Sequence, residues 1–176
     1  MVVVSVVGVL TALMLTVSTR AIDRARSVRC EAQLRGFGPA VQSFRDANRD
    51  QLPYADDFVS FGTGQTRPWD QLREHLDARW PVVDRSARTI HASPPLVCPS
   101  DRAVAREVGT SYAYPLWVYM SVLGQAATTR AVTASPGDFE LFRDADEFHT
   151  ARDGERGMNA LWADYSVRRV RAPGVR

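Results

Sequence analysis

Residues 1–20, MVVVSVVGVLTALMLTVSTR, run directly into residues 21–48, AIDRARSVRCEAQLRGFGPAVQSFRDAN, and these two stretches decide the fold. No charged side chain occurs among the first nineteen residues, and five arginines follow between positions 20 and 35. An apolar helix of about 18 residues is about 27 Å long, close to the ~30 Å hydrocarbon core of a bilayer. No basic residue precedes the run and no small-x-small cleavage site follows it, so we predict a retained membrane anchor.

The helical pattern continues beyond the apolar run. Apolar residues recur every three to five positions, which keeps them on one face of a helix whose other faces carry the charges. Pro39 cannot donate to the carbonyl four residues earlier and predicts a kink, and Pro53 disfavours helix in the residue before it. We expect one long kinked helix, with a membrane half at 1–19 and an amphipathic half at 20–52. The apolar face comprises Ile22, Ala25, Val28, Ala32, Phe37, Val41 and Phe44.

Residues 53–176 show the shorter patterns of a compact head. The stretch TRPWDQLREHLDARWP at 66–81 predicts a short amphipathic helix that ends at Pro81. Aromatic and β-branched residues in TSYAYPLWVYMSVLG at 110–124 predict a strand that is broken at Pro115. The residues expected on the apolar face of the helix at 66–81 are Trp69, Leu72, Leu76 and Trp80.

The C-terminal stretch predicts a β-hairpin. Residues 158–162 and 167–171 read as two short strands around a turn at 163–166. We expect Trp162 to lie on the face that packs against the long helix. The predicted fold class is therefore α+β, with a long kinked N-terminal helix packed on a small antiparallel β-sheet with long loops. The helix residues expected to bury Trp162 are Phe37, Val41 or Phe44.

Composition and motifs argue against several classes of protein. The net charge is +2, from 22 basic and 20 acidic residues, which is too balanced for a nucleic-acid-binding surface. All basic residues are arginine, so lysine chemistry is excluded, and GFGPA at 36–40 lies in a helical pattern rather than after a strand. Neither a nucleophile motif nor a metal-ligand spacing of histidine or cysteine occurs. We predict no enzymatic activity and no cofactor. The scattered histidines are His75, His91 and His149.

Several elements, in their order, resemble the type IV pilins and the pseudopilins of type II secretion. CEAQL at 30–34 begins a segment that leads through an aromatic residue to LP at 52–53. CPSD at 98–101, TSYAYP at 110–115 and FHTARDGERGMNALWADYSVRRV at 148–170 are similar to elements of a bacterial major-pseudopilin-like subfamily. The resemblance implies a structural subunit whose apolar helix is stored in the membrane and then packs against other helices in a fibre.

The resemblance also implies a location and partners. It predicts a single-pass protein of the bacterial inner membrane, with the head on the periplasmic side. The expected partners are other pilin-like subunits, membrane lipid and the secretion or pilus assembly machinery, with no nucleic acid. Small residues such as Gly8 and Ala12 would let neighbouring helices approach closely. The residues assigned to the membrane and polymerisation helix are Val2, Val6, Gly8, Val9, Leu13 and Val17.

Two departures from the family pattern generate further expectations. The family places a basic leader, a cleavage glycine and a glutamate before its apolar run; we expect Met1 to be an internal methionine and these elements to lie upstream. The arginines at 20–35 would, by the positive-inside rule, put the head in the cytoplasm, which a basic leader would reverse. ADYS at 163–166 stands where the family has Asp-Gly-His, which predicts a wider or type I turn rather than a two-residue type I′ turn.

Cys30 and Cys98 are expected to form a disulfide if the head is exported to an oxidising compartment; the alternative is two buried free thiols. The acidic stretch GDFELFRDADEFHTARDGE at 137–155 is a weak calcium candidate, since some pseudopilins hold calcium in a C-terminal loop. Its spacing is not that of an EF-hand, and we expect arginine to neutralise the acids and no metal to bind. The candidate ligands are Asp144, Asp146 and Asp153.

The alternative function is a monomeric, membrane-anchored binding module of the cell envelope. In that case the loops expected at 54–66 and 126–154 would carry recognition, because binding residues concentrate on loops held by a rigid scaffold.

Overall fold

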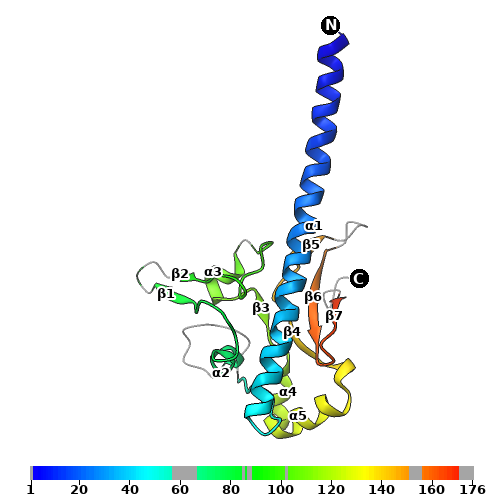
Figure 1. Ribbon diagram of the computed structural model, residues 1–176. Coiled ribbons are helices and arrows are strands. Elements are labelled where there is room, and N and C mark those ends of the chain that lie inside the picture. The colour runs from blue at the N-terminus through cyan, green and yellow to red at the C-terminus, as the bar shows by residue number, and fades with distance from the viewer. Residues whose placement is uncertain are drawn as a thin grey trace.

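The computed structural model describes residues 2–56, 67–84, 86, 89–101, 103–150 and 156–170, and for residues 2–13, 15–17, 150 and 156 it describes the backbone alone. The fold is α+β, with one long N-terminal helix and antiparallel sheets. The C-terminal half of the helix lies against the head, and the N-terminal half extends beyond it (Figure 1). This arrangement confirms the predicted fold class at the level of its helix and sheet.

The head combines short helices with two antiparallel sheets. In the larger sheet β3 pairs with β4 and β4 with β6, while β5 and β7 also pair with β6. The two strands β1 and β2 form a separate hairpin that lies on the opposite side of α1 from β7 (Figure 1). The elements are α1 (Val2–Ala47), α2 (Pro68–Leu72), β1 (Val82–Asp84), β2 (Thr89–His91), α3 (Val104–Val108), β3 (Tyr112–Ala113), α4 (Leu116–Leu123), α5 (Gln125–Ala134), η1 (Pro136–Asp138), β4 (Glu140–Asp144), β5 (His149–Thr150), β6 (Arg156–Trp162) and β7 (Val167–Val170).

The buried stripe of α1 begins later than its apolar pattern suggests. Ile22 and Val28 are each 51% exposed, so the predicted face does not pack along its whole length. The stripe advances by alternating steps of four and three residues, the spacing of one helical face. The helix continues through Pro39 and ends at Ala47, where Arg49 and Asp50 adopt left-handed φ angles of 54° and 62°. The buried residues of the stripe are Cys30, Leu34, Phe37, Val41 and Phe44.

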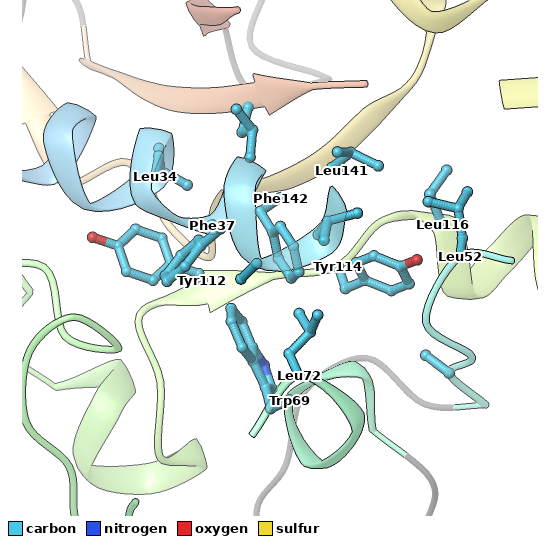
Figure 2. Close-up of a cluster of buried hydrophobic side chains, with 14 of the residues drawn as sticks. Leu34, Phe37, Leu52, Trp69, Leu72, Tyr112, Tyr114, Leu116, Leu141 and Phe142 are labelled. Carbon is cyan, nitrogen blue, oxygen red and sulfur yellow. The ribbon is translucent and has the colours of Figure 1, made fainter. Parts of the chain in front are cut away.

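An aromatic cluster joins α1, α2 and the sheet. Phe37 contacts the rings of Trp69, Tyr112 and Phe142 edge-on, with centroid distances of 5.1, 5.2 and 5.3 Å. Figure 2 shows Trp69 rising from α2 toward Phe37 and Phe142. The Tyr114 hydroxyl, which is also buried, donates to the carbonyl of Pro53 at 2.9 Å. The core therefore lies between one face of α1 and elements far along the chain.

Two predicted elements of the head are wrong in extent or type. The helix expected at 66–81 ends at Leu72. The residues after Pro115 form α4 rather than a strand, because a proline with φ near −61° begins a helical turn without needing its missing N–H. Pattern alone does not separate helix from strand in a short apolar run.

The C-terminal hairpin is confirmed, but Trp162 does not pack in the core as predicted. Leu161 and Ala163 belong to the buried cluster, whereas Trp162 is only half-buried and lies under the guanidinium of Arg168, 5.0 Å from its carbon to the ring centroid. Since successive side chains of a strand alternate between faces, Trp162 lies on the face opposite Leu161, together with the buried Met158 and Ala160, and it is not among the side chains packed against the core cluster. The expectation that Phe37, Val41 or Phe44 buries Trp162 is therefore wrong.

The hairpin turn is wider than two residues, as its sequence predicts. Tyr165 adopts a left-handed φ of 61°, and the amide of Trp162 donates to the carbonyl of Ser166 at 2.9 Å. The Tyr165 hydroxyl donates to the Gln42 side chain at 2.7 Å, so the turn is fastened to α1. A Cβ atom added to Gly38 would lie 3.1 Å from the Tyr165 ring.

Gly36 and Gly38, which lie just before Pro39 in α1, provide a matched pair of substitutions. Gly36→Ala should raise the free energy of unfolding by about 0.8–1.0 kcal/mol, because no atom lies within 4 Å of the added methyl group and alanine favours helix. Gly38→Ala should gain less, since the Tyr165 ring must move. Urea denaturation of both variants measures the difference. An equal or larger gain at Gly38 would contradict the contact with Tyr165.

Candidate functional site

The N-terminal half of α1 is the first candidate site. It extends beyond the head (Figure 1), and the described side chains of Met14 and residues 18–26 are exposed. The first buried side chain on α1 that the structure describes is Cys30. The residues assigned to polymerisation lie on this protruding part, and the surroundings of their side chains lie outside what the structure describes. They are Val2, Val6, Gly8, Val9, Leu13 and Val17.

Charged residues follow on the exposed surface of α1. Asp23 and Arg26 lie 3.6 Å apart, and Glu31 and Arg35 also lie 3.6 Å apart, at the spacing of neighbouring turns. Exposed pairs of this kind contribute little to stability, typically under about 1 kcal/mol. Among the residues that the structure describes, no helix has both the length and the hydropathy needed to cross a membrane.

A disulfide joins α1 to the head where the protruding part ends. The structure contains the predicted bond between Cys30 and Cys98, whose Cα atoms are 5.2 Å apart across a sequence separation of 68. Both sulfur-bearing residues are fully buried. The amide of Cys98 donates a hydrogen bond to the Ser111 hydroxyl at 2.9 Å, and Ser111 directly precedes β3. The bond thus fixes the helix to a loop that is itself held beside β3.

A buried acid and a buried histidine lie against this disulfide. Nε2 of His149 is 3.6 Å from Sγ of Cys98 and 3.3 Å from Oδ2 of Asp144. The same Asp144 oxygen accepts a hydrogen bond from the amide of Asn159 at 2.6 Å. We call Cys30, Cys98, Asp144 and His149 the junction cluster. The sheet assembles it, because β4 ends at Asp144 and the chain then returns as β5, which begins at His149 beside β6.

Burial dominates the electrostatics of the junction cluster. Asp144 is completely buried, and the loss of hydration raises the pKa of its carboxyl. The hydrogen bonds from His149 and from the Asn159 amide lower this pKa, but they do not reverse the shift. Among the described residues, the second oxygen of Asp144, Oδ1, has no hydrogen-bond partner. The cluster therefore contains an acceptor that the surrounding protein leaves unused.

A polar cavity of about 470 Å³ opens beside the junction cluster. His149 and Ser100 line it together with four acidic residues and one arginine, Arg26. Asp101 is one of these acids, and its carboxylate already accepts from three amides at the start of α3 and from the Ser111 hydroxyl. The excess of acid favours cations over anions in this cavity. The acidic residues of the lining are Asp23, Asp101, Asp146 and Glu147.

Of the three calcium candidates, the two that the structure describes lie in different surroundings. Asp144 is buried in the sheet and contacts His149, whereas Asp146 is exposed and accepts a hydrogen bond from the Glu147 amide at 2.7 Å. Asp153 lies outside the described residues. Arg143 lies 3.6 Å from Glu140, a neighbouring acid of the same stretch.

Sequence reasoning missed the partners of the disulfide. In the sequence His149 is one of three scattered histidines, and it falls together with Asn159 in the C-terminal element that resembles the family. Residues 30, 98, 144 and 149 are separated by strands and turns, so no fixed spacing could have joined them. The one available signal was that a histidine and an aspartate both fall in the stretch just before the C-terminal hairpin.

A second polar pair lies on the other side of α1. The Ser43 hydroxyl is 2.8 Å from Nδ1 of His75, and the His75 ring packs edge-on against Phe44 with centroids 5.7 Å apart. Serine and histidine form hydrolytic sites when a donor pocket for an oxyanion completes them. Here the contacts fasten the segment after α2 to the helix, and we assign them a structural role.

Asp144→Asn should change how stability depends on pH. Because the pKa of Asp144 is raised in the folded protein, the native state keeps a proton that the unfolded chain loses above about pH 4. The carboxyl therefore lowers the free energy of unfolding as pH rises through the interval between the two pKa values, whereas asparagine cannot ionise. The difference, variant minus wild type, should increase with pH from about 3 to 7 in urea denaturation.

Asp146→Asn is the matched control, because it removes the same charge from an exposed position. Subtracting its effect leaves the contribution of burial. If the difference for Asp144→Asn stays constant or decreases as pH rises, the folded protein does not raise the pKa of Asp144.

Comparisons with known proteins add no relative: no family model, no curated protein and no solved structure matches this chain. A functional proposal accordingly rests on the arrangement of its own residues and on the resemblance of its motifs.

Proposed function

We propose that this protein is a structural, pilin-like or pseudopilin subunit of a type II secretion or type IV pilus-like fibre. The observation that carries the proposal is the division of one 46-residue helix into two halves. One half is built into the core of the head, and the other extends away from it (Figure 1). Such a helix is suited to connect a folded domain to a membrane and then to a bundle of identical helices.

The composition of the protruding half supports a partner for it. Residues 2–19 carry no charge and consist mainly of valine, leucine, threonine and serine. Apolar side chains on an isolated helix are unfavourable in water, and lipid or neighbouring helices remove them from it. We propose that lipid covers this stretch before assembly, with the head on the periplasmic side, and that neighbouring subunits cover it in the fibre. Bending at Pro39 would adapt the helix to the bundle.

The attachment of the head supports the same role. The disulfide at Cys30 and the aromatic cluster around Phe37 hold the head to the helix at two levels. A subunit that is moved from a membrane into a fibre by its helix needs a head that follows the helix without rotating on it. A freely hinged head would suit a tethered binding module better than a regular fibre.

Site-specific cross-linking tests the proposal. Both native cysteines are in the disulfide, so a cysteine introduced by Met14→Cys is the one free thiol. The variant is encoded at the native chromosomal locus, which preserves any upstream leader. A bifunctional maleimide should then yield cross-linked dimers in the native host, because one thiol per subunit joins subunits in pairs. The dimers should disappear in a strain that lacks the prepilin peptidase.

Val82→Cys is the matched control variant, because Val82 is 64% exposed on the β1–β2 hairpin rather than on α1. It should give fewer cross-links than Met14→Cys. If Met14→Cys stays monomeric in membranes of the wild-type host, the fibre proposal fails and the monomeric binding module becomes the better account.

A further inference from the structure

The fold brings three potential metal ligands together that the sequence keeps apart. The sulfur atoms of Cys30 and Cys98 and a ring nitrogen of His149 all lie within 4.8 Å of one another, and all three residues are buried. Cysteine and histidine are the residues that most often bind structural zinc. In the oxidised protein the sulfur atoms are bonded to each other and are not free to bind a metal.

We propose that reduction of the Cys30–Cys98 disulfide converts the junction cluster into a zinc site. A dithiol reductant breaks the sulfur–sulfur bond, supplies two electrons and two protons, and becomes a disulfide itself. Zn²⁺ then replaces the two thiol protons, which leave to solvent, and binds both thiolates. His149 provides the third ligand through Nε2, with its remaining proton on Nδ1.

The geometry of the histidine fits a tetrahedral site. Zinc binds sulfur at about 2.3 Å and imidazole nitrogen at about 2.0 Å, so tetrahedral ligands of these two types lie about 3.5 Å apart. Nε2 of His149 is already 3.6 Å from Sγ of Cys98. The histidine therefore needs no new position on its strand, and the main adjustment is the separation of the two sulfur atoms.

Asp144 completes the ligand set. Its Oδ2 is 3.3 Å from Nε2 of His149, and its Oδ1 has no hydrogen-bond partner among the described residues although it is buried. An unused buried carboxylate oxygen is costly unless a cation or a donor occupies it. Carboxylate oxygen is an established zinc ligand, so Asp144 is the fourth ligand of a Cys₂HisAsp site.

The cavity beside His149 supplies a route for the metal. It reaches the buried ring from solvent, and its acidic lining attracts divalent cations. His149 belongs to both the cavity and the ligand set, whereas Asp23, Asp146 and Glu147 lie only on the wall of the cavity. Zinc and the disulfide exclude each other, since both use the same two sulfur atoms. Either would hold α1 to the head, so the inference does not depend on the fibre.

Metal binding to the full chain tests the inference. The purified protein is reduced with a phosphine, which takes one oxygen from water as it releases the two thiols, and is desalted without oxygen. Zn²⁺ is then titrated in competition with a chromophoric chelator, and Co²⁺ serves as the spectroscopic probe. Reduced protein should bind one Zn²⁺ per chain, and Co²⁺ should give thiolate charge-transfer bands and tetrahedral d–d bands. Oxidised protein should give neither.

Variants identify the ligands. His149→Ala should weaken zinc binding by at least about tenfold, because loss of a zinc ligand or its support typically costs 10–100-fold. His91→Ala is the control, since His91 is exposed on β2 and should leave the affinity unchanged. Equal zinc affinity in His149→Ala and wild type would overturn the site.

If His149→Ala does not fold, zinc binding can still be tested on the reduced wild-type protein. A ligand that binds the folded state raises the melting temperature, so Zn²⁺ should raise that of the reduced protein and not that of the oxidised protein. Failure of Zn²⁺ to stabilise the reduced chain, or a Co²⁺ spectrum without tetrahedral thiolate bands, would overturn the proposal.

Discussion

Phe37→Ala should lower the free energy of unfolding by about 3–5 kcal/mol, because it removes a fully buried ring from a packed core. Three other rings, those of Trp69, Tyr112 and Phe142, contact Phe37 edge-on, and each such contact adds about 0.5–1.5 kcal/mol beyond burial alone. These neighbours come from different elements and cannot collapse into the cavity without moving the backbone. The expected cost therefore lies at the upper end of the range.

Urea denaturation of the oxidised full chain, followed by tryptophan fluorescence, measures this loss. Val83→Ala is the control, since Val83 lies on the β1–β2 hairpin and is 41% exposed. It should cost less than about 1 kcal/mol. A loss below that value for Phe37→Ala would show that the contact between α1, α2 and the sheet does not hold the head together.

Loss of the Cys30–Cys98 disulfide should cost about 4 kcal/mol. The bond closes a loop of 68 residues, and the chain-entropy model gives this magnitude for a loop of that length. The double substitution Cys30→Ala with Cys98→Ala removes the bond without burying two hydroxyl groups. Denaturation in the presence of a metal chelator measures the loss, so that zinc cannot replace the bond.

Two comparisons separate the disulfide from packing at the same position. Wild-type protein that is reduced and kept under chelator should lose nearly the same free energy as the double variant. Cys30→Ala alone should match the double variant, because one cysteine cannot form the bond. A loss below about 1 kcal/mol in all three would contradict the tether between helix and loop.

The sequence predicts the helices, strands and turns most accurately where the deciding pattern is local. The periodicity of α1 gave the helix through Pro39, and the alternation at 158–162 gave β6 and its hairpin. The missing glycine at Tyr165 correctly indicated a wider turn. Each of these depends on residues within a few positions of one another, and their backbone preferences decide the outcome.

Prediction failed where distant residues decide. The choice between Leu161 and Trp162 as the core-facing residue depends on which face of β6 meets α1. Alternation shows that the two residues lie on opposite faces but does not identify the face that meets α1. The stretch after Leu72 has the apolar periodicity of a helix, but the helix ends at Leu72. His149 and Asp144 reach Cys98 only because β4 and β5 pair with successive parts of β6. Pairing of this kind is tertiary, and no spacing in the chain encodes it.

The place of the disulfide along α1 has a mechanical consequence. A pulling force on the protruding helix would act on the head first at Cys30, the first of its described buried residues. Without a covalent bond there, the helix could peel from the head one turn at a time, with each contact broken singly. With the bond, the load passes into the loop at Cys98, and the contacts from Leu34 to Phe44 are sheltered from it. The disulfide between Cys30 and Cys98 therefore carries the tension between the protruding helix and the head.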